Sequence, residues 1–115
     1  MEYAKLTVNN NKITIVFNEV TISDKDKAVN LVKLYKKAVI ENTNIHLIVD
    51  CSKLISVNRN IAFFVVKNLR KFEDTNSYRF VDKTIVITKP SLRVLANLIM
   101  KFFPPVVKTN IVKTL

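Results

Sequence analysis

The chain has 115 residues, of which 49% are apolar, and a formal net charge of +10. That length holds one domain, residues 1–115, and the apolar fraction can fill its core without a metal or disulfide staple. Because the sequence has no glycine, it cannot contain a glycine-rich phosphate loop, a dinucleotide-binding turn or a GxSxG nucleophile elbow.

We find no targeting segment in the sequence. No apolar run approaches the roughly 18 residues of a membrane span, and the N-terminus has no signal-peptide core. Cys51 is the single cysteine, so an intramolecular disulfide cannot form, which is typical of a reducing compartment. We therefore expect a protein without a transmembrane segment that is cytoplasmic or otherwise intracellular and is not secreted.

The charge is unevenly distributed. Nineteen basic residues stand against nine acidic ones, and from Lys83 onward the chain has six cations and no side-chain carboxylate. Such a field favours an acidic partner, which can be nucleic acid, an anionic lipid head or an acidic protein. The thirteen asparagines support a second interpretation, in which the cations reflect a Lys/Asn-rich proteome and only keep the surface solvated.

The first part of the chain predicts a hairpin followed by a helix. Residues 5–9 and 12–18 alternate apolar and polar side chains, as strands do, around a turn of asparagines. Ser23 then looks like the N-cap of a helix that runs to about Glu41. Left-handed turn positions must fall to asparagine in the absence of glycine. The candidates are Asn10, Asn42, Asn44 and Asn76.

Residues 45–52 read as the central strand. Five of the first seven are apolar and the run ends in small polar residues, which predicts a strand buried on both faces. Asp50 and Ser52 therefore lie at the carboxyl end of a central strand, where open α/β sheets usually place their sites.

Two further helices and strands follow. We expect a polar loop over 53–60, a helix from about 58 to 72, a polar connection over 73–82, a buried strand over 84–88, a helix opened by Pro90 and stopped by Pro104-Pro105, and an extended segment over 110–115. The predicted fold is a single small α/β domain of β-β-α-β-α-β-α-(β) order. It has a mixed four- to five-stranded sheet and three helices, all on one face.

This order resembles the STAS domain, the fold of anti-sigma-factor antagonists. The matching residues are the strand end Leu47-Ile48-Val49-Asp50-Cys51-Ser52, the hydrophobic turn Ile55-Ser56-Val57, and Asn58-Arg59-Asn60-Ile61 at the start of the next helix. In antagonists the serine at the position of Asn60 accepts a phosphoryl group. Asparagine cannot, so the resemblance implies a domain without the phospho-switch, in which Asn58 still caps the helix.

The last third also resembles the second half of CRAL-TRIO lipid-binding domains. The likeness covers the strand 84–88, Lys89-Pro90-Ser91, and Leu98-Ile99-Met100-Lys101-Phe102-Phe103-Pro104. This chain lacks the extra N-terminal helices of those domains. The resemblance implies an apolar cavity beneath the third helix and a lipid that copurifies with the protein.

No constellation of catalytic or metal-binding residues stands out. His46 is the only histidine and has no cysteine or second histidine at ligand spacing, so we expect neither a metal site nor a cofactor. Strand alternation directs residues 46 and 51 to opposite faces, so Cys51 reads as core. Asp50 and Ser52 read as a turn held by side-chain bonds to the backbone, with a polar pair as the alternative. We expect no enzyme.

Nucleic-acid binding needs aromatic side chains among the cations. Tyr78 and Phe80 are the candidate stacking platforms, and the cations are those of the second and third helices. Those cations are Arg59, Lys67, Arg70, Lys71, Lys89 and Arg93.

Our leading hypothesis is a non-enzymatic, STAS-like protein–protein interaction module, which serves as a small structural or regulatory subunit of a larger assembly. The alternatives are the lipid-binding module and the basic nucleic-acid binder. By the family resemblance, the partner contacts the second helix and the loop before it. The residues expected there are Leu54, Ser56, Asn58, Arg59, Asn60, Lys67, Arg70 and Lys71.

Overall fold

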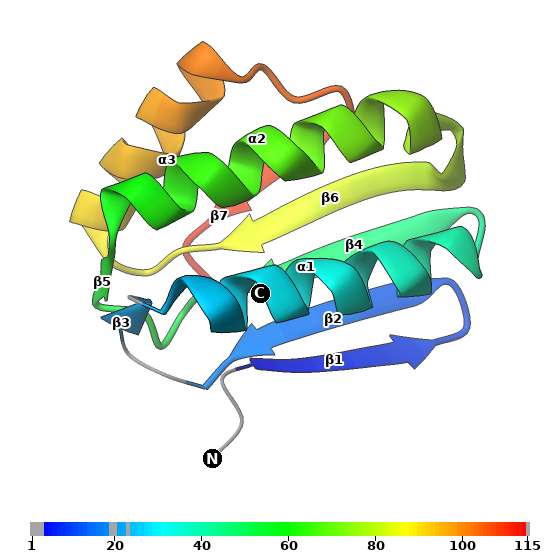
Figure 1. Cartoon of the computed structure of the whole chain (residues 1–115), viewed down its shortest axis with the longest axis horizontal. Coiled ribbons are helices and arrows are strands. Elements are labelled where there is room, and N and C mark those ends of the chain that lie inside the picture. Colours follow the sequence, from blue (N-terminus) through cyan, green and yellow to red (C-terminus); the bar gives the residue numbers. More distant parts are fainter. Residues whose placement is uncertain (1–3, 19–20, 23, 115) are drawn as a thin grey trace.

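A computed structural model describes residues 4–18, 21–22 and 24–114. Within these residues the chain forms one five-stranded sheet and three α-helices (Figure 1). The strands of this sheet are β1 (Ala4–Asn9), β2 (Lys12–Phe17), β4 (Ile45–Asp50), β6 (Phe80–Val86) and β7 (Thr109–Val112). The helices are α1 (Lys25–Ile40), α2 (Arg59–Asn76) and α3 (Pro90–Phe102), and a 3-10 turn, η1 (Ser77–Arg79), follows α2. Two short strands, β3 (Thr21–Ile22) and β5 (Ser56–Val57), pair with each other outside the sheet.

The sheet has the order β1-β2-β4-β6-β7. β1 and β2 form an antiparallel hairpin, and every other neighbouring pair is parallel. The predicted single α/β domain with a mixed sheet is therefore confirmed, with β4 in the centre and the C-terminal segment as a parallel edge strand.

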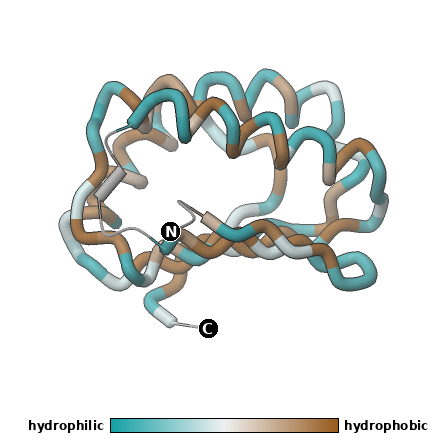
Figure 2. Tube along the Cα trace, turned by 60° about the horizontal axis from the view of Figure 1, so that its bottom comes forward, coloured by the Kyte–Doolittle hydropathy of each residue, from teal (hydrophilic) through white to brown (hydrophobic). Residues whose placement is uncertain are grey.

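All three helices lie on one face of the sheet (Figures 1 and 2). The crossovers β2-α1-β4, β4-α2-β6 and β6-α3-β7 all step in the same direction across the sheet. Because such crossovers are right-handed, steps in one direction put their helices on the same side. Among the described residues the strand order never reverses, so this sheet has no topological switch point, and none of the three helices lies on its second face.

The prediction that β4 is buried on both faces is therefore wrong. Ile45 and Leu47 point toward the helices and are 0% and 2% exposed, whereas the side chain of His46 between them is 51% exposed. The apolar residues of the run therefore belong to two faces of the strand. Ile45 and Leu47 lie on the buried face, and Ile48, which is half-buried, lies on the open face.

Several predicted boundaries move in the structure. α2 continues to Asn76, and β6 begins at Phe80 rather than at residue 84, so most of the predicted polar connection belongs to regular elements. The helix before β4 is capped by Asp24, which accepts hydrogen bonds from the amides of Asp26 (2.9 Å) and Lys27 (3.2 Å). The predicted cap, Ser23, lies outside the described residues.

Other local predictions are confirmed. Asn10 and Asn44 take left-handed backbone angles, with φ of 55° and 52°, while Asn42 and Asn76 do not. The Asn58 side chain accepts a hydrogen bond from the amide of Ile61 (3.1 Å) and caps α2. Pro90 occupies the first turn of α3, where its missing N–H leaves no hydrogen bond unmade.

Candidate functional site

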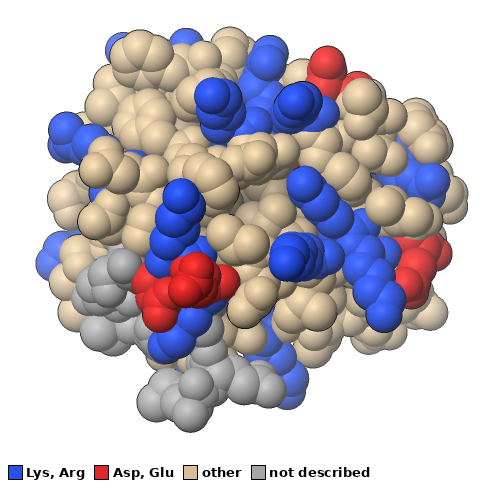
Figure 3. All heavy atoms as spheres, in the orientation of Figure 1, with Lys and Arg blue, Asp and Glu red and all other residues tan. Residues whose placement is uncertain are grey.

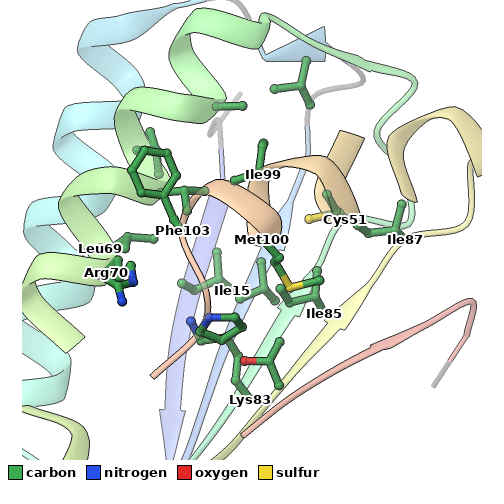
Figure 4. Close-up of a pocket in the computed structure, with 18 of the residues that line it drawn as sticks. Ile15, Cys51, Leu69, Arg70, Lys83, Ile85, Ile87, Ile99, Met100 and Phe103 are labelled. Carbon is green, nitrogen blue, oxygen red and sulfur yellow. The ribbon is translucent and has the colours of Figure 1, made fainter. Parts of the chain in front are cut away.

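An apolar cavity of about 280 Å³ lies between the helices and the inner face of the sheet. Figure 4 shows side chains of α2, α3 and the sheet arranged around it. Those labelled there are Leu69 and Arg70 of α2, Ile99 and Met100 of α3, Phe103 just beyond α3, Ile15, Lys83 and Ile85 of the sheet, and Cys51 and Ile87 at the strand ends. Apart from a few polar groups described below, the lining is aliphatic or aromatic.

Small side chains on the helices leave this space. Ala28 of α1, Ala62 of α2 and Ala96 of α3 all line the cavity. Protein interiors are normally packed as densely as organic crystals, with few voids larger than a water molecule. Alanine at one position on each helix leaves volume that the larger neighbouring side chains do not fill.

An ion pair borders the cavity between α2 and β6. Glu73 is 3% exposed, and Lys83 donates to both of its carboxylate oxygens, at 2.9 Å for Oε2. Neither residue was predicted to belong to a site. The sequence did contain a signal, because Val65, Leu69 and Glu73 follow one another at helical spacing and so put Glu73 on the apolar stripe of α2.

Tyr35 of α1 lies beside this pair. Its ring packs edge-on against Phe72, with 5.9 Å between the ring centroids. Its hydroxyl is buried and makes no hydrogen bond of normal geometry with the described residues. Burial raises the pKa of Tyr35 well above 10, and the nearby Glu73 carboxylate raises it further. Burial and the adjacent carboxylate therefore both favour the neutral phenol.

Arg70 is the remaining charged residue of the lining. It lies one turn before Glu73 on α2, is half-buried, and donates from Nε to the carbonyl oxygen of Pro104 (2.7 Å). This bond ties the guanidinium to the segment that follows α3. Among the described residues no carboxylate pairs with Arg70, so it contributes an uncompensated positive charge to the cavity.

Cys51 contacts the same cavity at the carboxyl end of β4. Burial raises the pKa of its thiol to about 12, and the Asp50 carboxylate contributes to the shift. A thiol with that pKa is protonated at neutral pH and is a poor nucleophile.

His46 lies on the other side of the sheet. Its Nδ1 is 3.0 Å from Oδ1 of Asp82, the neighbouring residue on β6, and the pair is exposed. The expected opposition of residues 46 and 51 across the sheet is confirmed, and the side chain of His46 is 51% exposed. Asp50 accepts a hydrogen bond from the amide of Ser52 (2.9 Å), so the predicted turn is present.

Of the eight residues expected to contact a partner, six are exposed and two, Leu54 and Arg70, are not. Leu54 is 5% exposed and packs in the core with Ile61 and Leu92. Arg70 turns to the cavity. The other six are exposed, four around the start of α2 and two along it: Ser56, Asn58, Arg59, Asn60, Lys67 and Lys71.

The helical face is positively charged (Figure 3). Two lysines of α1 lie over aromatic rings of α2, with Lys25 Nζ 4.5 Å from the centroid of Phe64 and Lys36 Nζ 5.6 Å from that of Phe72. The outward side of α3 differs, because Val94 and Phe102 are 68% and 66% exposed.

The two candidate stacking platforms are in different environments. Tyr78 is exposed beside the guanidinium of Arg79, whose carbon is 5.1 Å from the ring centroid. Phe80 is half-buried and packs against the core under α1.

Within the described residues, no three His, Cys, Asp or Glu side chains gather as a metal site would require. In the same part of the chain, no helix has both the length and the apolar composition needed to cross a bilayer.

No family model and no curated protein matches the sequence. The likeness to STAS and CRAL-TRIO domains therefore stays a prediction.

Proposed function

We propose that this protein binds a small lipid-like molecule in the cavity between its helices and its sheet, without transforming it. The observation that carries the proposal is the cavity of about 280 Å³ with its apolar lining. An engineered cavity of about 150 Å³ lined by Leu, Ile and Phe holds a benzene molecule. This volume is larger and approaches the range of about 300–1,000 Å³ in which small-molecule pockets fall.

The free-energy cost of an unfilled cavity supports a bound ligand. Closed cavities made by truncating core residues cost about 24 cal/mol per Å³, and this cavity, which is partly open to solvent, costs less per unit volume when it is unfilled. Typical domains have only about 5–15 kcal/mol of net stability. An apolar ligand removes this cost and gains burial of its own surface.

The chemistry of the lining supports binding rather than catalysis. Lys83 and Glu73 neutralise each other, Cys51 is a neutral thiol, and His46 lies on the opposite face of the sheet. The resemblance of residues 84–104 to CRAL-TRIO lipid-binding domains agrees with the proposal.

Native mass spectrometry tests it. The protein purified without detergent is expected to carry a noncovalent adduct above its mass of 13.2 kDa, and organic extraction should remove it. If the protein is bare both as purified and after incubation with mixed-lipid vesicles, the proposal is wrong. A parallel sample washed with organic solvent and refolded is the control for adventitious adducts.

A second candidate is the protein-interaction module that the STAS resemblance implies. Exposed residues in and before the first turn of α2 favour it, since Ile55 is 55% exposed and Arg59 and Asn60 are exposed as well. Arg59→Glu combined with Asn60→Asp reverses the charge there and should abolish binding of a specific partner in a pull-down. Lys33→Glu on α1 is the matched control. A partner retained equally by all three proteins would exclude this surface.

A further inference from the structure

Arg70 is the charged residue of the cavity lining that has no ion-pair partner among the residues that the structure describes. The charged side chains of the lining are Arg70, Glu73 and Lys83. Because Glu73 and Lys83 pair with each other, the described lining keeps one net positive charge. Arg70 is only half-buried, so solvent can reach its charge, and a cation at the wall of an apolar cavity is available to an anionic group of a ligand.

The geometry of Arg70 leaves part of it available. Its Nε is occupied by the carbonyl of Pro104 at 2.7 Å, which fixes the plane of the guanidinium. The two terminal amino groups, Nη1 and Nη2, make no hydrogen bond or ion pair with the described residues. Figure 4 shows the Arg70 side chain beside Leu69 at the edge of the cavity, on the side where α2 faces Phe103 and Met100.

We infer that the ligand is a single-chain amphiphile with a carboxylate head, which binds Arg70 while its chain fills the cavity. This inference rests on the proposed function and specifies its ligand class. A planar guanidinium holds both oxygens of a carboxylate through two parallel hydrogen bonds. One uncompensated cation matches one negative charge, whereas a phosphate monoester carries nearly two.

The ligand is thereby oriented. Its apolar chain lies against the aliphatic lining that ends at Ile87 and Leu92, and its head stays at the half-buried guanidinium. The basic helical face adds a long-range attraction for anions that depends on ionic strength.

Matched ligands test the inference by titration calorimetry at pH 7. Decanoate and 1-decanol share a chain length and differ in the head. Wild-type protein is expected to bind decanoate about 10- to 100-fold more tightly, because a charge-assisted pair is stronger than a neutral hydrogen bond. Added NaCl should weaken decanoate binding and leave decanol binding unchanged or stronger.

The variant Arg70→Gln should bring the affinity for decanoate to within about twofold of that for decanol, and Arg70→Lys should retain part of the difference. Lys101→Gln is the control, since Lys101 is exposed on α3 and outside the cavity lining. The salt dependence uses wild-type protein, so the test survives if Arg70→Gln does not fold.

The results that would contradict the carboxylate inference differ from those that would contradict the proposed function. If decanoate and decanol bind wild-type protein equally, the carboxylate inference is overturned and the proposed function stands. If Arg70→Gln weakens both ligands by the same factor, Arg70 supports the structure and not the head group, and the inference is again wrong. Tighter binding of decyl phosphate than of decanoate would overturn the carboxylate assignment. If none of the ligands binds, the proposed function fails as well.

Discussion

Lys83→Met is expected to lower the free energy of unfolding by about 3–5 kcal/mol, because it leaves the Glu73 carboxylate buried without its counter-ion. Glu73 is almost completely enclosed between α2 and β6. Methionine keeps the length of the lysine stem, so the change removes the charge and little packing. Since typical domains have about 5–15 kcal/mol of stability, this loss is large enough to unfold part of the population at physiological temperature.

Urea unfolding followed by circular dichroism measures the loss. The double variant Glu73→Leu with Lys83→Met should regain most of it, since replacing a buried ion pair by apolar residues of similar volume is often neutral or stabilising by about 1–4 kcal/mol. The cycle of wild type, two single variants and the double variant gives the coupling energy directly.

An exposed pair provides the control. His46→Gln breaks the contact with Asp82 on the open face of the sheet and should change stability by no more than about 1 kcal/mol. If Lys83→Met is as mild as His46→Gln, the Glu73 carboxylate reaches water or another partner in solution, and the ion pair is not a structural element.

Ala96→Phe is expected to weaken ligand binding about 100-fold without unfolding the protein. Ala96 lies on the cavity wall contributed by α3, so a ring at that position occupies ligand volume. Excluding three or four methylenes of a ligand removes roughly 2.5–3 kcal/mol at about 0.8 kcal/mol each, which is about a 100-fold loss of affinity.

The free energy of unfolding of ligand-free Ala96→Phe protein is the second measurement. Filling a cavity commonly stabilises a protein by about 0.5–2 kcal/mol, whereas overpacking a full core costs about 1–3 kcal/mol. An increase in the free energy of unfolding would therefore indicate that the cavity is empty space in the ligand-free protein.

Val94→Phe is the matched control, because Val94 lies on the same helix and faces outward. It should leave affinity unchanged. If Ala96→Phe binds decanoate as tightly as wild-type protein, the ligand occupies another site and the proposed function loses the observation on which it rests.

Local features of this fold could be predicted from the sequence because short-range sterics determine them. Asparagine supplies the left-handed residues at Asn10 and Asn44 where glycine is missing. Asn58 caps α2 and Pro90 opens α3 for reasons that involve only neighbouring backbone groups. The periodicity of the apolar residues predicted the order of strands and helices. The largest error in the predicted boundaries comes after Phe72, where polar residues continue the helix.

Part of the candidate site could also be anticipated. Arg70 and Leu54 were singled out for a partner surface; Leu54 is buried in the core, and Arg70 is half-buried at the wall of the cavity. Glu73 and Lys83 lie ten residues apart on different elements, and no local pattern indicates that they meet. Only the packing of α2 on β6 brings them together.

The sequence by itself determined the order of the main strands and helices and the starts of α2 at Asn58 and α3 at Pro90, since propensity, periodicity and capping act over a few neighbouring residues. The sequence also predicted all three helices on one face of the sheet, but only the tertiary structure decided the strand order that leaves the other face open, because the direction of each crossover depends on where its next strand pairs. The tertiary structure also decided the cavity, because alanines on three separate helices leave a shared space only when those helices pack over the same strands. An amphipathic stripe specifies which residues turn inward, whereas the volume that remains between them depends on all the facing elements together.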